Sequence, residues 1–324
     1  MSKTFDVSAT LPASGEAARP TDAAGGRLPA AARLGTVELV VSDLERSIRF
    51  YEEQLGLHAH ARDRDRVDLT AAPDGGSEPL LALVERPDAR PSGSFANLFH
   101  VALKTPSRDE LALTYRRILD AGGSLAYAID HWPHSSIYID DPDGSTVELL
   151  VDKPAEAWGV LQEEIDLYYR SPPPPALDLD ALAAAAQPAG GAYAPARGAT
   201  RWSVNHVHFD TAVADYERAR DFYVPALGFE LNAEHLAWRV LFGRVGSYHH
   251  HVAVNAWRKL DRRPDAGLEL AGIRRWSLIL PDQADVDATA SRLRQHGFAV
   301  ASLDDGAIES SDPAGITVRV GRDA

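Results

Sequence analysis

Apolar residues along the chain recur first with the period of a β-strand and then with that of an α-helix. Residues 34–41 form a short, mostly apolar run of strand length. Over residues 44–55 apolar side chains return at every third or fourth position, which is the spacing of an amphipathic helix, and Ser42 with Glu45 offers a capping box before it. The pattern therefore predicts a strand, followed by a helix that ends near Gly56.

This combination of strand and helix occurs four times along the chain. The other three predicted pairs lie at 98–104 with 107–120, at 204–209 with 215–227, and at 273–280 with 282–295. Asp-Pro-x-Gly segments that begin at Asp141 and Asp312 predict turns before two closing strands, since proline fixes φ and glycine tolerates a positive φ. The chain is therefore predicted to be an α+β protein built from four units of strand, helix and several strands.

Two segments lack this periodicity. Residues 1–33 are rich in Ala, Gly, Pro, Ser and Thr, which is typical of a disordered tail. Residues 156–200 contain four consecutive prolines from Pro172 and an alanine-rich run, which is typical of a linker that is stiff where the prolines stand. The patterned remainder is predicted to form two domains of two units each, residues 34–155 and residues 201–324.

Composition narrows the class of protein. A formal charge of −14 and a pI near 5.3 argue against nucleic acid as a partner, because binding to nucleic acid needs a clustered basic face. There is no cysteine, which excludes thiolate ligands, disulfides and cysteine nucleophiles. Neither a signal peptide nor an apolar run of membrane-spanning length is present. We therefore expect a cytoplasmic protein with a small-molecule partner and no membrane partner; a homo-oligomer is compatible with the sequence.

Residues that could bind a metal lie on the predicted strands. His100 belongs to the first strand of the second unit and Glu148 to its closing strand. His206 and His208 share one face of the first strand of the third unit, because side chains alternate along a strand. Imidazoles with one carboxylate and no thiolate are the ligand set of a non-haem Fe(II) or similar site, which leaves coordination positions open.

Five segments together resemble one known family. They are Leu98–Leu103, Asp130–His131, Tyr138–Leu149, Asn205–His208 and Tyr248–Trp257. With the four-unit plan, they are similar to the vicinal oxygen chelate superfamily of glyoxalase I, bleomycin-resistance proteins and extradiol dioxygenases, and most of all to two-domain catechol 2,3-dioxygenase-like proteins. The resemblance covers about residues 34–322 apart from the linker. It implies four βαβββ modules that pair into two open, cup-like half-barrels.

The resemblance also implies where the metal ligands stand. In this superfamily, ligands come from the first strands of two paired units and from a closing strand. The first unit lacks a histidine at the position of His100, and the fourth has Arg275 at that position and Arg319 at the position of Glu148. Only the second and third units together supply a full set. We therefore predict that these units pair, and that the metal binds His100, Glu148 and His206 across the two halves.

His208 competes with His206 for the third ligand position. In relatives the first histidine of the His-x-His pair binds the metal, which favours His206. Counting back from the predicted helix without a gap places His208 there instead. His206 is the favoured ligand and His208 the alternative.

Further roles follow from the resemblance alone. Tyr138, ten residues before the predicted carboxylate ligand, would donate a hydrogen bond to a substrate oxygen. His251 would act as the acid/base group, on a strand where His250 would point the other way. His131, or less securely His134, would lie near bound O₂.

The activity implied by these roles is that of an extradiol-type ring-cleaving dioxygenase. Fe(II), with Mn(II) as an alternative, would bind two vicinal oxygens of a catechol-like aromatic substrate, and O₂ would take the remaining position. One alternative is a glyoxalase-like isomerase or lyase, which usually needs a second carboxylate ligand. Another is a metal-free protein that binds a small molecule and confers resistance, which needs no metal ligands.

Overall fold

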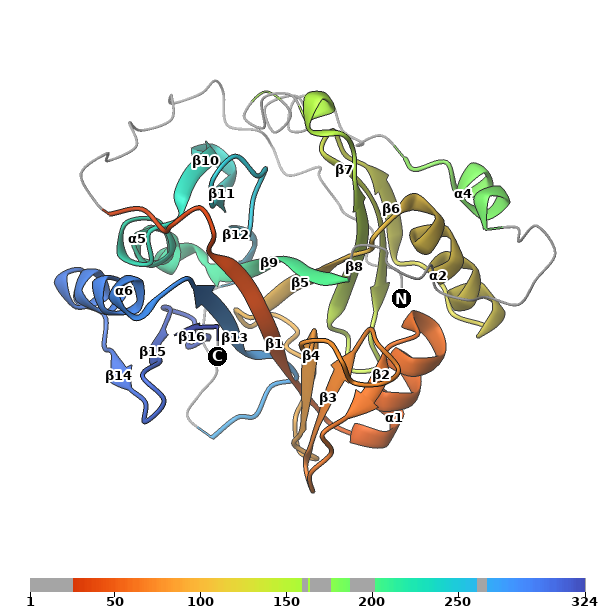
Figure 1. Ribbon diagram of the computed structural model, residues 1–324, viewed down its shortest axis with the longest axis horizontal. Helices are drawn as coiled ribbons and strands as arrows, with labels where there is room; N and C mark the ends of the chain where they lie inside the picture. The colour runs from red at the N-terminus through yellow and green to blue at the C-terminus, as the bar shows by residue number, and fades with distance from the viewer. Residues whose placement is uncertain (1–25, 159–162, 164–175, 187–201, 261–266, 324) are drawn as a thin grey trace.

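The computed structural model describes residues 26–158, 163, 176–186, 202–260 and 267–323. In this part of the chain sixteen strands form two open eight-stranded mixed sheets, with helices on their outer sides (Figure 1). Each sheet contains two βαβββ modules, and neither sheet closes into a barrel. The predicted fold class is confirmed.

The first half of the chain contains two of the modules. The first comprises β1 (Arg33–Val41), α1 (Leu44–Phe50), its π-helical continuation η1 (Tyr51–Leu55), β2 (His58–His60), β3 (Arg66–Thr70) and β4 (Leu81–Glu85). The second comprises β5 (Leu98–Lys104), α2 (Arg108–Asp120), β6 (Tyr127–Asp130), β7 (His134–Asp140) and β8 (Thr146–Asp152). Gly56 ends the first helix with a φ of +73°, as predicted.

The second half repeats the plan. The third module comprises β9 (Ser203–Ala212), η3 (Val213–Asp215), α5 (Tyr216–Asp221), η4 (Phe222–Ala226), β10 (Glu230–His235), η5 (Leu236–Trp238), β11 (Val240–Arg244) and β12 (Val252–Leu260). The fourth comprises β13 (Gly272–Leu280), α6 (Gln283–Gln295), β14 (Ala301–Ser302), β15 (Ile308–Ser311) and β16 (Thr317–Arg322).

The predicted capping box of the first helix is wrong in one detail. Asp43 is the N-cap, and its carboxylate accepts a hydrogen bond from the Arg46 backbone N–H at 2.9 Å. Ser42 instead donates its hydroxyl hydrogen to Asp143, in the turn of the second module, at 2.5 Å. A neighbouring carboxylate in the tertiary structure thus takes the side chain that local sequence would assign to the helix.

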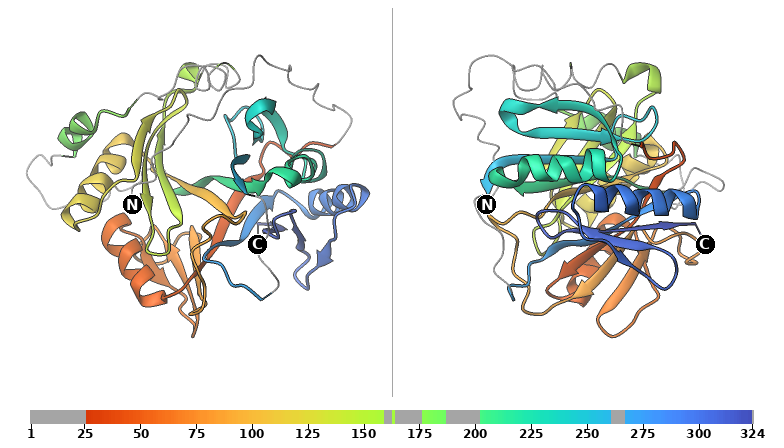
Figure 2. Two further views of the ribbon diagram at one scale, coloured as in Figure 1. Left: turned by 180° about the vertical axis from the view of Figure 1, so that it is seen from behind. Right: turned by 90° about the vertical axis from the view of Figure 1, so that its left-hand side faces the viewer.

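The modules are joined in two different ways. In the sheets, β5 pairs antiparallel with β9 and β1 pairs antiparallel with β13, so the second module joins the third and the first joins the fourth. The helices follow the chain instead: α2 packs against η1, and α6 packs against η4 (Figures 1 and 2). The predicted pairing of the inner units is confirmed.

Two buried tyrosines link consecutive modules at equivalent places. The Tyr51 hydroxyl donates to Asp141 Oδ2 at 3.2 Å, and the Tyr223 hydroxyl donates to Asp312 Oδ2 at 2.9 Å. Both aspartates begin the predicted Asp-Pro turns and also accept backbone N–H groups of those turns. Each turn therefore holds the helix of the preceding module as well as its own closing strand.

Parts of the predicted tail and linker are described. Leu28 is buried, and its N–H donates to the Gly228 carbonyl at 2.9 Å, whereas residues 1–25 lie outside the described residues. Among the described residues, η2 (Ala155–Ala157) overlaps the start of the predicted linker range, and α4 (Leu179–Ala185) lies within it and packs against α2 through the buried Leu182. The four prolines from Pro172 lie outside the described residues.

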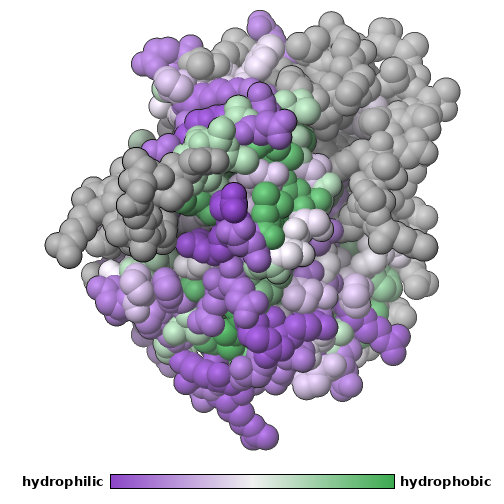
Figure 3. Space-filling view, turned by 90° about the vertical axis from the view of Figure 1, so that its right-hand side faces the viewer, coloured by the Kyte–Doolittle hydropathy of each residue, from purple (hydrophilic) through white to green (hydrophobic). Residues whose placement is uncertain are grey.

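Polar side chains cover most of the described part of the face that Figure 3 shows, with apolar side chains in small groups among them. Among the described residues, Leu119 is the large apolar side chain classed as exposed, at 44%. No helix in the described part of the chain has the length and apolar content to cross a bilayer. The apolar residues therefore serve mainly the cores beneath the helices.

Candidate metal centre

Three side chains from three adjacent strands converge inside the inner sheet. His100 on β5, Glu148 on β8 and His206 on β9 are 6%, 0% and 1% exposed. His100 Nε2 lies 3.0 Å from His206 Nε2 and 3.1 Å from Glu148 Oε2, and His206 Nε2 lies 3.0 Å from the same oxygen. The structure thus brings together the three residues that the sequence predicts as ligands.

These distances fit the coordination of a metal ion. Ligand atoms about 2.1 Å from a metal and at right angles to one another are about 3.0 Å apart, which is the facial arrangement of two histidines and one carboxylate. Buried atoms that bear lone pairs repel one another at this separation unless a cation or a proton lies among them. The donor set of His100, Glu148 and His206 therefore fits a divalent cation.

A hydrogen-bonded tyrosine holds the carboxylate. The Tyr138 hydroxyl on β7 donates to Glu148 Oε1 at 2.7 Å, which leaves Oε2 for the two histidines. His131 Nε2 lies 3.1 Å from the same hydroxyl, and because that hydroxyl gives its hydrogen to Glu148, His131 is the donor. The predicted catalytic residues Tyr138 and His131 are thus connected to the ligand set through Glu148.

Burial sets the protonation of this cluster. It lowers the pKa of His100 and of His206, against the opposing pull of Glu148, so both rings are neutral near pH 7. Burial, together with Glu148, raises the pKa of Tyr138, which therefore stays protonated and remains a donor. Neutral imidazoles and a carboxylate are the forms that bind a metal.

His208 occupies a different place from His206. It lies directly across from His100 in the pairing of β9 with β5, but its Nε2 is 3.0 Å from Asn255 Nδ2. Its ring packs edge-on against Phe99, with a centroid distance of 4.7 Å. The imidazole nitrogen of β9 that lies 3.0 Å from Glu148 Oε2 belongs to His206.

The three consecutive histidines before β12 do not alternate as a strand would. They lie ahead of Val252, where β12 begins, so the predicted orientation of His250 is wrong. The His250 ring centroid lies 4.3 Å from that of His206, and His250 Nδ1 lies 2.9 Å from His249 Nδ1. His251 instead accepts a hydrogen bond from the Val245 N–H, at 3.1 Å, and lines a separate cavity.

His134 lies with these histidines. Its ring centroid is 5.1 Å from that of His249, and its Nδ1 lies 2.8 Å from the Ser136 hydroxyl. Burial and neighbouring histidines hold the pKa of His134 and of His250 well below the ordinary value. Both rings are therefore neutral bases beside the candidate metal centre.

The outer sheet carries ion pairs in place of a ligand set. Glu38 on β1 is 5% exposed and faces Arg275 across the pairing of β1 with β13. Arg275 Nη2 lies 2.9 Å from Glu38 Oε2, Arg66 also pairs with that oxygen, and Arg274 reaches Oε1 at 3.5 Å. Arg319, at the repeat position of Glu148, pairs with Asp305. The two arginines that stand at ligand positions in the fourth module are therefore each neutralised by a carboxylate, Arg275 by Glu38 and Arg319 by Asp305.

We expect Glu38→Ala to lower the free energy of unfolding by about 1–3 kcal/mol, because it leaves arginines without their buried partner. Losses of about 3–5 kcal/mol apply to fully enclosed pairs, and these arginines reach solvent. Arg274→Ala, whose side chain is 52% exposed, should cost only about 0.2–1 kcal/mol. Urea unfolding measures both, and metal affinity should be unchanged in each. Loss of metal binding in the Glu38 variant would place a ligand in the outer sheet.

Four residues of the site's surroundings were not predicted from the sequence. They are Asn205, Tyr248, Asp152 and His250, which contact ligands or each other. Two signals in the sequence could have indicated them: Asn205 directly precedes His206, and both Asn205 and Tyr248 stand in segments that resemble the family.

Comparison with known proteins agrees with the fold. A family model of the Glyoxalase/Bleomycin resistance protein/Dioxygenase superfamily matches residues 33–149 and 204–320. The chain therefore belongs to this superfamily, as the resemblance predicted.

Individual relatives extend this result. Catechol-2,3-dioxygenase of Bacillus subtilis (strain 168) is 28% identical over 269 residues, which cover 82% of this chain and 89% of that protein. Among solved structures, the cppA protein of Streptococcus pneumoniae TIGR4 has a TM-score of 0.53 at 9% identity, over 90% of this chain and 98% of the other. Glyoxalase I of Zea mays has a TM-score of 0.50 at 15% identity, over 90% and 92%. The two solved structures show a shared fold.

Proposed function

We propose that this protein is a non-haem Fe(II)-dependent, extradiol-type dioxygenase that cleaves the ring of a catechol-like aromatic substrate with O₂. The observation that carries the proposal is the triangle of His100 Nε2, Glu148 Oε2 and His206 Nε2, with sides of 3.0–3.1 Å. A facial set of two histidines and one carboxylate leaves three coordination positions, enough for a bidentate diol and for O₂. Similarity to a catechol-2,3-dioxygenase supports the choice of substrate class.

The ligand residues would hold Fe(II), with Mn(II) as the alternative. When bound, the metal would act as a Lewis acid that lowers the pKa of substrate oxygens and orients substrate and O₂. Glu148 contributes one oxygen to this role, because its other oxygen accepts the Tyr138 hydroxyl. His131, as the donor to that hydroxyl, orients Tyr138 at the edge of the site.

A buried histidine would receive the proton of the substrate. We place this role on His250 rather than on His251, because the His250 ring lies beside that of His206. Its neutral ring can accept a proton, and its Nδ1 is within hydrogen-bond distance of His249 Nδ1. His251 accepts the Val245 N–H and faces another cavity, so its lone pair is already engaged.

We expect the Fe(II)-loaded protein to consume O₂ with catechols and to form a yellow ring-fission product. Catechols and hydroquinones would be compared in an oxygen electrode, with iron measured on protein purified without added metal. The matched control is Arg275→Ala, which should keep its iron and its O₂ uptake because the residue lies in the outer sheet. A protein that binds iron stoichiometrically but consumes no O₂ with any of these substrates would contradict the proposal in favour of an isomerase or lyase. A protein that binds no metal would favour a binding protein.

A further inference from the structure

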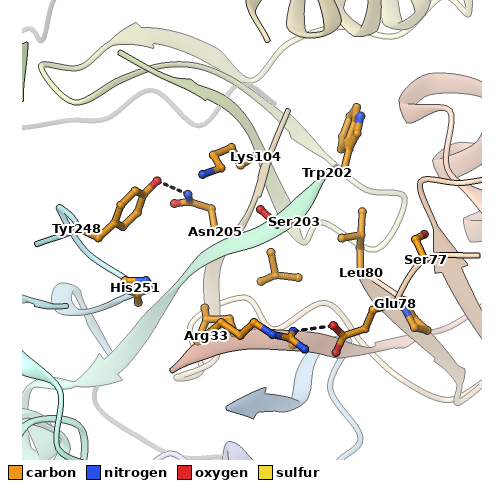
Figure 4. Close-up of a pocket in the computed structure, with 14 residues that line it drawn as sticks. Arg33, Ser77, Glu78, Leu80, Lys104, Trp202, Ser203, Asn205, Tyr248 and His251 are labelled. Carbon is orange, nitrogen blue, oxygen red and sulfur yellow. Dashed lines mark hydrogen bonds and ion pairs between the residues drawn. The ribbon is translucent and has the colours of Figure 1, made fainter. Parts of the chain in front are cut away.

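A chain of hydrogen bonds runs from one predicted metal ligand, His206 on β9, to Asp152 at the end of β8. His206 Nδ1 lies 2.8 Å from Asn205 Oδ1. Asn205 Nδ2 donates to the Tyr248 hydroxyl, as the dashed line in Figure 4 shows. That hydroxyl in turn lies 2.8 Å from Asp152 Oδ1 and 3.0 Å from Oδ2. Asn205 is 5% exposed, so these groups exchange few hydrogen bonds with water.

The carboxylate of Asp152 stands at the end of this series of hydrogen bonds, and it determines the direction of each of them. Burial acts to raise the pKa of Asp152, but the nearby His249, the Lys104 ammonium and the hydrogen bond from Tyr248 lower it, so Asp152 is ionised and can only accept. Burial and Asp152 raise the pKa of Tyr248, so its single hydroxyl hydrogen stays and goes to Asp152. The Tyr248 oxygen must then accept from the amide nitrogen of Asn205.

The orientation of the amide fixes the tautomer of the histidine. With its nitrogen turned to Tyr248, Asn205 presents its oxygen to His206 Nδ1, which must carry the hydrogen. His206 Nε2 is then unprotonated, and its lone pair points at His100 Nε2 and Glu148 Oε2. These hydrogen bonds thus hold the His206 ring in the one tautomer that can bind a metal through Nε2.

We propose that Asn205 and Tyr248 are positioning residues that set the tautomer and orientation of His206 and thereby the affinity of the site for its metal. The inference rests on the proposed function, since it takes His206 as a ligand. It assigns no chemical step to either residue. Both residues line a cavity of about 360 Å³ together with Ser203, Lys104 and His251 (Figure 4).

The test compares two replacements of nearly equal size and shape. Asn205→Leu removes the acceptor, and we expect metal affinity to fall about 10- to 100-fold, as for other outer-shell partners of metal-bound histidines. Asn205→Asp keeps an acceptor and adds a charge that makes the imidazole a better ligand, so affinity should be at least that of the wild type. A purely structural role for Asn205 predicts that neither replacement changes the affinity of the folded protein.

Further variants test the other residues that take part in these hydrogen bonds. Tyr248→Phe removes the group that orients the amide, and we expect a smaller loss of affinity than for Asn205→Leu. Asn205→Asp combined with Asp152→Asn keeps the number of carboxylates constant and should retain the affinity. Ser203→Ala is the matched control, because Ser203 lines the same cavity from the same face of β9 and takes no part in the chain.

Mn(II) and Co(II) dissociation constants would be measured by competition with a chelator, and the Co(II) absorption spectrum would report the ligand geometry. Circular dichroism checks folding, and Asn205→Ala, which leaves room next to an existing cavity, substitutes if Asn205→Leu does not fold. Wild-type affinity and spectrum in a folded Asn205→Leu or Asn205→Ala protein would overturn the inference. Wild-type affinity in Glu148→Ala would instead overturn the metal site itself, so the two failures are distinguishable.

Discussion

His206→Ala is expected to lose stoichiometric metal, and with it all O₂ uptake, whereas His208→Ala should keep both. His206 Nε2 is one corner of the 3.0 Å triangle, while His208 Nε2 faces Asn255. Loss of a direct ligand should cost more affinity than the about 10- to 100-fold that an outer-shell change costs. The measurement is metal content per chain after dialysis, followed by chelator competition.

The two histidines form a matched pair for this experiment. They lie two positions apart on β9, and both are buried, so their alanine variants remove similar packing. The His208 ring also packs 4.9 Å from that of His100, and for this reason its variant should lose affinity by no more than about tenfold. The opposite ranking of the two variants would assign the ligand role to His208.

Glu148→Gln should abolish the stabilisation that a metal gives to the folded protein. A ligand that binds only the native state at 100 times its dissociation constant adds about 2.7 kcal/mol to the free energy of unfolding, and at 1,000 times about 4.1 kcal/mol. The wild-type protein should show this increase with Mn(II), and the variant should show almost none. Urea unfolding with and without Mn(II) measures the difference.

The control for this variant compares the free energies of unfolding of Glu148→Gln and of the wild type, both without metal. Glutamine keeps an oxygen that can accept the Tyr138 hydroxyl, and it removes a buried charge that faces His100 and His206. We therefore expect metal-free Glu148→Gln to be at least as stable as the metal-free wild type. A large loss of stability without metal, together with an undiminished gain on adding Mn(II), would show that Glu148 serves the fold and binds no metal.

The repeat in the sequence was sufficient to predict four modules. Each unit carries its own strand and helix periods, and the second and fourth also carry an Asp-Pro-x-Gly turn signal, so the modules follow from local pattern. The pairing of inner with inner modules followed from the ligand positions that the family resemblance implies, because Arg275 and Arg319 stand at two of them. The pairing of β5 with β9 confirms that argument.

Local pattern failed where a segment left regular structure. Strand alternation predicts that His250 points away from His249 and His251, but β12 begins only at Val252. Side chains outside a strand do not alternate with a fixed period. The sequence pattern therefore could not predict that His250 lies beside His206 and that His251 lines the cavity. The N-cap at Asp43 differs from the prediction for a similar reason, because Ser42 binds Asp143 of another module.

The sequence alone determined the kinds of donor available and the strands that carry them. The absence of cysteine restricted the donors to imidazoles and carboxylates, and the ligand positions that the family resemblance implies then predicted His100, Glu148 and His206 as one set. Only the tertiary structure decided between His206 and His208 as the side chain nearest Glu148, and only it brought Asn205, Tyr248 and Asp152 into one chain. Those contacts join residues up to 96 positions apart, and a local period cannot specify a hydrogen bond between separate modules.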